Sequence, residues 1–445
     1  MRATKHLQAS LLRCASSDLS SPGGRTFDLI EGALIDTSPP FQPTLSINGG
    51  FMAVALECLI CDGVQMLSSQ PFAQKFRQPS DSESQLLSLV LRGIGTTQPE
   101  LARRSGLSQQ TVSRLVNDLV TRGALELGER RSNGKRGQPS FEIAIAPGYA
   151  FSLGLALMTD AMSILLMDFA GNVVDYAYFD MPVMSRKAVF TKIAEAKEQF
   201  FAARPEARER LVGIGIGISG YCLDGKARYN PPPALDEFAM IPLDALFSEA
   251  LGLPAWVEND GNAAAIGESF LGAGRAYSDF VYMFVAAGIG GGVIANHHLM
   301  RGTHGNGGEI GLILPWRLYQ LPTLETLLQS LRRHGVDLDG ISAMLANFDP
   351  DWPGVDEWIE KSRDPLSLIA SSISALLDPE AIVLGGRLPK SLAEKMIPAI
   401  ELFDDARRHE PRPLPKLVLS QTSVDACAIG AAMLPLEAEF FSSML

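Results

Sequence analysis

Apolar residues recur at helical spacing between residues 81 and 122, in three short runs separated by turn residues. Ser108 is a good N-cap for the third run, and Gly123 is placed to end it. Two strand-like runs follow, 124–127 and 141–145, on either side of a Gly-rich basic loop. This order of elements predicts a winged helix-turn-helix domain over residues 81–147. The apolar stripe of the third helix consists of Val112, Leu115, Val116 and Leu119.

After Pro147, strand-like apolar runs alternate with helical segments, which predicts an α/β architecture. The clearest strand-like runs are 151–157, 163–168, 212–218, 280–285 and 381–384. We place this second domain at residues 148–436 and a tail at 437–445. Residues 1–80 are rich in Ser, Pro and Gly and show no sustained period, so we expect a poorly ordered extension there.

The polar face of the third helix has the composition of a DNA-reading surface. Gln, Asn and Arg can make paired hydrogen bonds to base edges, and Ser or Thr can bond phosphates or bases. The alternative is an ordinary solvated helix face, but the preceding turn and the basic hairpin favour DNA binding. The candidate DNA-binding residues on this helix are Gln109, Gln110, Thr111, Ser113, Arg114 and Asn117.

The hairpin tip, residues 130–139, is basic and contains Lys135 and Arg136. A flexible basic wing can reach phosphates and insert a guanidinium into a narrow minor groove. The alternative for this segment is a solubilising loop.

Charge is distributed unevenly along the chain. The formal net charge is -12, which by itself argues against a nucleic-acid partner. From Ser84 to Ser140, however, nine Lys or Arg residues face four Asp or Glu residues, so this stretch carries 9 − 4 = +5. A basic module on an acidic body suits a regulator whose body does not adhere to DNA.

Five cysteines, odd in number and widely spaced, favour a reducing cytoplasm over a disulfide framework. Cys58 and Cys61 form a single CxxC pair with no second pair or histidines nearby, so a structural role is favoured over a metal site. The most apolar run, 51–67, is interrupted by Glu57 and Asp62 and is too short to cross a bilayer. We therefore expect a cytoplasmic protein with neither a bound metal nor a cofactor, and without membrane attachment.

Several stretches together resemble one known family. Residues 257–268 (VENDGNAAAIGE), 305–311 (GNGGEIG) and the wing at 136–139 (RGQP) are similar to motifs of the ROK family, and in particular of its repressor branch. The similarity covers roughly residues 82–436. It implies a fold in which an N-terminal winged helix-turn-helix precedes an actin-like, sugar-kinase-like ROK domain of two lobes.

The resemblance implies a set of sugar-binding residues. Asn259 and Asp260 correspond to the family's sugar ligands, and an Asp there also serves as the base in the kinases. The alternative is a helix-capping Asn-Asp pair. Glu309 would also bond sugar hydroxyls, and Glu325 corresponds to a last sugar ligand. Leu312 stands where the family has His, which implies an effector other than plain glucose: a deoxy, substituted or smaller sugar.

One family feature is missing, and three further stretches resemble the family. No cysteine lies between Cys222 and Cys427, so the family's structural zinc cluster is absent. Residues 287–293 resemble the second phosphate loop, although a plain glycine-rich strand-turn-strand is an alternative. Residues 378–386 resemble the adenosine-side strand and turn, and 425–432 the C-terminal helix.

The first phosphate loop, which corresponds to residues 154–171, departs most from the family's Asp-x-Gly-Gly-Thr pattern. Ala156 stands where the Asp belongs, Met158 and Thr159 replace the glycines, and Asp160 replaces the Thr. Phosphoryl transfer depends on positioning and charge stabilisation, so we expect no kinase activity.

The sequence thus predicts a DNA-binding regulator of carbohydrate genes, with double-stranded operator DNA and a sugar effector as partners and a homodimer or homotetramer as its assembly. One alternative is an ATP-dependent sugar kinase with a DNA-binding appendage. The other is a regulator controlled by a protein partner.

Overall fold

The computed structural model describes residues 27–30, 33–36, 76–131, 140–225, 227–315, 317–404, 410–422 and 425–442. Contacts divide the chain into two compact units, Met1–Ser69 and Gln70–Leu445. In the first unit, β1 (Phe27–Ile30) pairs antiparallel with β2 (Ala33–Asp36). Most of the expected extension at 1–80, the Cys58–Cys61 pair, and Lys135 and Arg136 of the wing lie outside the described residues.

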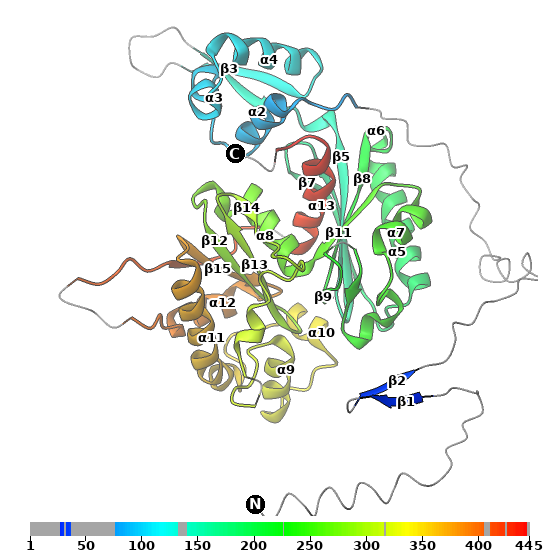
Figure 1. The fold of residues 1–445 in the computed structure, drawn as a ribbon, viewed down its shortest axis with the longest axis vertical. Helices are drawn as coiled ribbons and strands as arrows, with labels where there is room; N and C mark the ends of the chain where they lie inside the picture. Colours follow the sequence, from blue (N-terminus) through cyan, green and yellow to red (C-terminus); the bar gives the residue numbers. More distant parts are fainter. Residues whose placement is uncertain are drawn as a thin grey trace, which may run out of the picture. The chain divides into compact units, whose positions relative to one another are not determined.

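The second unit begins with a winged helix-turn-helix (Figure 1). Its elements are α2 (Asp81–Leu91), α3 (Gln98–Ser105), α4 (Gln109–Thr121), β3 (Leu125–Arg131) and β4 (Ser140–Ile145), with β3 and β4 antiparallel. The hydroxyl of Ser108 caps α4 by accepting the Thr111 N–H at 3.1 Å. The predicted apolar stripe of α4 is buried against Leu86, Leu101 and Ile143 in one core.

The first lobe of the following domain is built on a five-stranded sheet with the order β11-β8-β5-β6-β7. β5, β8 and β11 are parallel, and β6 and β7 are antiparallel to their neighbours. Central β5 and β8 are buried along their whole length, as their continuous apolar runs predict. The strands are β5 (Phe151–Leu157), β6 (Ala161–Asp168), β7 (Val173–Asp180), β8 (Leu211–Ile218) and β11 (Ala255–Asn259).

The second lobe repeats this topology in the order β14-β13-β12-β15-β16. In both sheets the first strand along the chain is central, the next two lie on one side of it as antiparallel neighbours, and the last two lie on the other side in parallel. The predicted two-lobed, sugar-kinase-like construction is therefore confirmed. The strands are β12 (Phe280–Val285), β13 (Ile289–Ala295), β14 (His298–Leu299), β15 (Ala381–Gly386) and β16 (Lys416–Leu419).

Helices complete a separate apolar core on each sheet. The first lobe has α5 (Arg186–Ala203), α6 (Pro205–Glu209) and α7 (Leu243–Leu251), with the short antiparallel pair β9 (Tyr221–Cys222) and β10 (Tyr229–Asn230). The second lobe has α9 (Leu324–Arg333), α10 (Ile341–Ala346), α11 (Val355–Leu377) and α12 (Lys390–Met396).

Two helices with small side chains, α8 (Asp260–Leu271) and α13 (Ala426–Glu439), pack against each other and link the lobes. Figure 1 shows α13 in red beside β5, β8 and α8. A Cβ on Gly430 would come within 1.5 Å of the Ala263 carbonyl oxygen, so only glycine permits this helix contact.

The C-terminal boundary differs from the sequence-based one. We expected a tail from residue 437, but α13 continues to Glu439, and Phe440 and Phe441 are buried. Phe441 stacks on Phe169 and Phe440 meets it edge-on, in the core that also contains residues of α2, α8 and α13. Their aromatic surface explains why these residues belong to the core.

Candidate functional site: a polar helix face and an interlobe cavity

The polar face of α4 is directed away from the core of the winged helix-turn-helix. The side chains of Gln109, Gln110, Arg114 and Asn117 are exposed, whereas Thr111 and Ser113 are partly buried. The helix N-terminus is fixed by the Ser108 cap, which also bonds the Thr111 hydroxyl at 2.9 Å. This arrangement leaves amide and guanidinium groups available at the end of the helix that enters a major groove in helix-turn-helix proteins.

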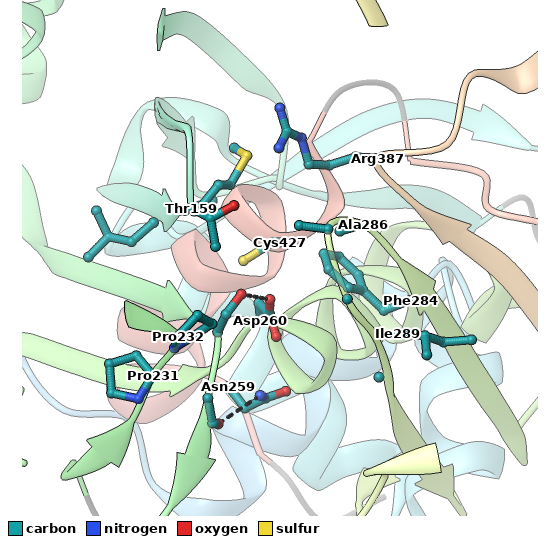
Figure 2. A pocket seen from close by; sticks show the side chains of 18 of the residues that line it. Thr159, Pro231, Pro232, Asn259, Asp260, Phe284, Ala286, Ile289, Arg387 and Cys427 are labelled. Carbon is teal, nitrogen blue, oxygen red and sulfur yellow. Dashed lines mark hydrogen bonds between the residues drawn. The ribbon is translucent and has the colours of Figure 1, made fainter. Parts of the chain in front are cut away.

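A cavity of about 470 Å³ lies between the two lobes, a size typical of small-molecule sites. Both sheets contribute to its walls, through Ala156–Thr159 and Ser219 from the first lobe and Phe284 and Gly288–Gly290 from the second. Asn259, Asp260 and Glu309 also line it, so the structure brings three of the four predicted sugar-binding residues together. Figure 2 shows Asn259 and Asp260 side by side in the cavity.

Asn259 and Asp260 lie where β11 ends and α8 begins. Asn259 caps α8, because its Oδ1 accepts the N–H groups of Gly261 and Asn262 at 2.9 and 3.1 Å. Its Nδ2 donates to the Gly220 carbonyl oxygen at 3.2 Å. The capping interpretation thus describes the geometry of Asn259, which lines the cavity with an amide that is already hydrogen-bonded.

Asp260 is held in the cavity by two donors. Its carboxylate accepts a short hydrogen bond from the Ser219 hydroxyl and one from the Gly261 N–H at 2.9 Å. Burial raises the pKa of Asp260, although these two hydrogen bonds oppose the rise. A buried carboxylate with lone pairs still directed at a cavity is suited to accept hydrogen bonds from a polar ligand.

Glu309 reaches the same cavity from the segment before the short 3₁₀ turn Ile310–Ile313. Gly308 precedes it with φ +103, and a Cβ there would meet the Gly291 carbonyl oxygen at 2.5 Å. Glycine is therefore required to bring Glu309 into place. Burial raises the pKa of Glu309 to about 7, and the charge of Asp260 adds to the rise.

Two residues that the resemblance placed at the sugar site lie outside the cavity wall. Glu325 is exposed in the first turn of α9, where its carboxylate accepts from Gln329 at 3.4 Å. Leu312 is 68% exposed and does not line the cavity. Glu325 is therefore not part of this site, and Leu312 is not placed to shape the ligand's selectivity.

The glycines at 287–293 are explained by backbone packing. Gly288 lies in the turn between antiparallel β12 and β13, where its carbonyl oxygen accepts the Ala286 N–H at 2.8 Å. The other three glycines, 290–292, lie within β13 and are paired with β12. A Cβ on Gly291 would meet the Tyr282 carbonyl oxygen at 2.3 Å. The strand-turn-strand alternative describes this geometry, and the turn's backbone also lines the cavity.

Sequence analysis missed several lining residues, among them Ser219, Arg387 and Asp425. Ser219 could have been found, because it follows β8, and the carboxyl ends of parallel β8 and β11 meet at one sheet edge. Asp425 caps α13 through the N–H groups of Cys427 and Ala428 at 3.0 and 3.2 Å. Arg387 directly follows β15, and the resemblance of residues 378–386 to the adenosine-side strand and turn was the signal available for it.

Helix α8 connects the cavity to the DNA-binding domain. Its first residue is Asp260, and its last turn contacts Arg92, the C-cap of α2. The Arg92 guanidinium donates to the carbonyl oxygen and the hydroxyl of Ser269, both at 3.1 Å, and lies 4.1 Å over the Phe270 ring. Burial lowers the pKa of Arg92 to about 10, although the charge of Glu437 on α13 opposes this. Arg92 remains a buried cation between the two domains.

Within the described parts of the chain, no three His, Cys, Asp or Glu side chains are grouped as a metal site would require. Over the same residues, none of the helices is both long and apolar enough to cross a membrane.

Comparisons with known proteins agree with this construction. The family model described as the ROK family matches residues 153–319, and a model described as the MarR family matches residues 78–137. An uncharacterized protein of Sinorhizobium fredii is 28% identical over 362 residues, 81% of this chain and 92% of its own. The xylose repressor of Bacillus subtilis is 29% identical over 247 residues, 55% of this chain and 62% of its own.

The fold has also been seen experimentally. A crystal structure described as a ROK family transcriptional regulator, a homologue of the Escherichia coli Mlc protein, superimposes with a TM-score of 0.56 at 20% identity. The match covers 80% of this chain and 96% of that one. A winged helix-turn-helix joined to a two-lobed sugar-kinase-like domain defines the class of DNA-binding regulators built on a kinase fold. Within that construction, residues 153–319 match the ROK family model, so the two-lobed part of the chain contains a ROK family domain.

Proposed function

We propose that this protein is a transcription regulator, most simply a repressor, that binds operator DNA through α4 and the adjoining wing and senses a sugar in the interlobe cavity. Helix α8 is the observation that carries the proposal. Its first residue, Asp260, lines the cavity, and Ser269 and Phe270 in its last turn hold Arg92 of α2. A ligand that moves α8 therefore acts directly on the DNA-binding domain.

The cavity supports a hydroxyl-rich ligand. Asp260 and Glu309 present carboxyl oxygens that accept hydrogen bonds from hydroxyl groups, and Asn259 adds an amide. Phe284 and Ile289 supply apolar surface for the face of a ring. An unmatched buried polar group costs about 1–3 kcal/mol, so such a site discriminates between sugars by the positions of their hydroxyls. D-xylose is the first candidate, since the Bacillus subtilis relative is named a xylose repressor.

The same cavity argues against phosphoryl transfer. The side chains of Met158 and Thr159 line the wall where the resemblance places the first phosphate loop, and Asp160 adds a carboxylate beside them. Close approach of a polyphosphate requires backbone N–H groups and cations rather than these side chains. We therefore propose a sensor without kinase activity.

We further propose that the chain acts in the cytoplasm as a homodimer or homotetramer, with residues 81–147 as its DNA-binding domain and the sensor beginning at 148. Two copies would place two recognition helices on half-sites about one helical turn apart. The regulated genes would be those of carbohydrate metabolism.

A thermal-shift screen of the full chain against a sugar panel tests the proposal. At a concentration about 100 times its Kd, a sugar that binds the folded protein contributes about 2.7 kcal/mol, which raises Tm by several degrees. We expect D-xylose or a related sugar to do so, and the same sugar to remain unphosphorylated when incubated with Mg-ATP. Phosphorylation of the sugar would establish the kinase alternative, whereas a panel with no shift would favour control by a protein partner.

A further inference from the structure

Four polar side chains from four different elements meet where the two lobes face each other. The first lobe supplies Asp160, from the turn between β5 and β6, and Tyr178, from β7. The second lobe supplies Ser342, from α10, and Arg387, which directly follows β15. They are more than 150 residues apart across the lobes, so only the tertiary fold brings them together.

These four groups form a closed hydrogen-bonded network. Arg387 Nη1 donates to Asp160 Oδ1 at 2.6 Å, and Nη2 donates to the Tyr178 hydroxyl at 2.9 Å. The Ser342 hydroxyl donates to Asp160 Oδ2 at 3.0 Å and lies 2.8 Å from the Tyr178 hydroxyl. Every member therefore contacts at least one member from the opposite lobe.

The ion pair at its centre is withdrawn from solvent. The Arg387 side chain is 9% exposed and that of Asp160 is 30% exposed. Burial alone would lower the pKa of Arg387, but the hydrogen bond and charge of Asp160 overcome this and raise it. A pair in such surroundings contributes little when intact, yet removing one partner leaves an uncompensated charge and is strongly destabilising.

The network also forms part of the cavity wall. Arg387 lines the cavity, as do Met158 and Thr159 just before Asp160. In the view of Figure 2, Arg387 and Thr159 lie toward one end and Asn259 toward the other, with Asp260 between them. The interlobe contact is thus made at the end of the cavity away from Asn259.

We propose that Asp160, Tyr178, Ser342 and Arg387 form an interlobe clasp that holds the two lobes together over the cavity. The two lobes are separate sheets with separate cores, and this side-chain network joins them directly at the cavity. This goes beyond the proposed function, because it assigns a role to four residues that take no part in the proposed DNA or sugar contacts. The lobe arrangement that a sugar must change, or select, is defined by these contacts.

Hydrogen exchange of the full chain, measured by mass spectrometry without sugar or DNA, tests the clasp. The reporters are the Met181 amide, which donates to the Asp160 carbonyl oxygen, and the Met344 amide in α10. Asp160→Asn and Arg387→Gln should each accelerate exchange at both reporters by roughly tenfold or more, because each leaves the other charge of a partly buried pair without its partner. The double variant, in which both charges are removed, should exchange more slowly than either single variant.

Arg208→Gln is the matched control, since it breaks the exposed Arg208–Glu198 pair within the first lobe. It should leave both reporters unchanged. Single variants that exchange like the wild type, or a double variant that exchanges as fast as the two single effects combined, would overturn the clasp. If the neutral variants do not fold, Arg387→Lys decides: it keeps the charge but loses the planar fork, so exchange should still rise, and wild-type exchange would overturn the proposal.

Discussion

Carboxyl groups stand in opposite electrostatic surroundings at two places along the interlobe cavity. At one, burial raises the pKa of both Asp260 and Glu309, and the charge of Asp260 raises that of Glu309 further; among the described residues neither is joined to a cation in an ion pair. At the other, Asp160 is neutralised by Arg387, which is itself held by Tyr178. The comparison distinguishes two uses of a carboxyl group. Without a cationic partner it can still accept hydrogen bonds from a ligand, whereas paired with a cation it joins the two lobes.

Removal of the Asp260 charge should have the largest effect of the substitutions considered, and the quantity affected is the affinity for sugar. Asp260→Asn keeps an oxygen for the Gly261 N–H but loses the charge-assisted hydrogen bonds to a sugar, so sugar binding should weaken by about 2–3 kcal/mol. Calorimetric titration with the sugar identified by the screen measures this. The matched control is Glu325→Gln, which alters an exposed carboxylate outside the cavity and should leave affinity unchanged. Equal affinity in both variants would mean that the cavity is not the sugar site.

The recognition helix provides the second test, at the DNA end of the molecule. Arg114→Ala should weaken binding to the specific operator by about 1–3 kcal/mol if Arg114 contacts a base. Lys135→Ala should instead weaken binding to all sequences and reduce the salt slope by about one phosphate contact. Arg208→Ala, which removes an exposed arginine of the sensor domain, is the control for both. If operator footprints and salt slopes are the same for all three variants, α4 is not the recognition helix.

Substitution of Arg92 should reduce the coupling between sugar binding and operator binding more than it reduces the affinity for sugar. Arg92→Lys keeps a cation but loses the paired contacts with Ser269 and the flat stack on Phe270. We expect the effect of sugar on operator affinity to fall by about 0.5–2 kcal/mol, with sugar affinity itself little changed. Arg103→Lys, on exposed α3, is the control. An undiminished sugar effect in Arg92→Lys would show that the signal leaves the cavity by another route.

Substitution of Glu309 should have a smaller effect, on the stability of the folded protein, and this effect should depend on pH. Its folded pKa is raised from 4.5 to about 7, so the folded protein holds this proton more tightly than the unfolded chain does. The stabilisation from Glu309 is therefore fully present below about pH 4.5 and is lost as pH rises through about 7. Glu309→Gln should be more stable than the wild type at pH 8, by roughly 1–2 kcal/mol after allowance for solvent screening.

Urea unfolding at pH 5 and pH 8 measures this difference. Glu325→Gln serves again as the control and should follow the wild type at both values. If the advantage of Glu309→Gln is the same at pH 5 as at pH 8, the burial of Glu309 beside Asp260 is not the cause.

Local pattern was sufficient for most of the fold. The helical stripe of α4, its Ser108 cap and the continuous apolar runs of β5 and β8 are set by side chains a few residues apart, which sequence periodicity records directly. The C-terminal boundary was missed because Phe440 and Phe441 are buried by α2 and Phe169, which are distant in sequence.

The residues that line the cavity could be predicted only where the local sequence itself fixes the backbone conformation. Asn259 and Asp260 lie at a strand-to-helix junction, and Glu309 follows a glycine with positive φ, so both segments keep a recognisable sequence. Arg387 and Ser342 have no such local requirement, and their role depends on the approach of two lobes. The prediction that Glu325 is a sugar ligand was wrong for the same reason. The direction of its side chain relative to the cavity depends on the tertiary fold and not on the local sequence.

The central claim is that the cavity and the recognition helix are coupled through α8, and thermodynamic reciprocity tests it most directly. Operator affinity is measured with and without saturating sugar, and sugar affinity with and without saturating operator, on the wild-type chain. Coupling requires the two ratios to be equal, and we expect each to lie between about 5-fold and 150-fold. A sugar that binds tightly yet gives ratios of one in both directions would contradict the account, because its binding would then leave the DNA-binding domain unaffected.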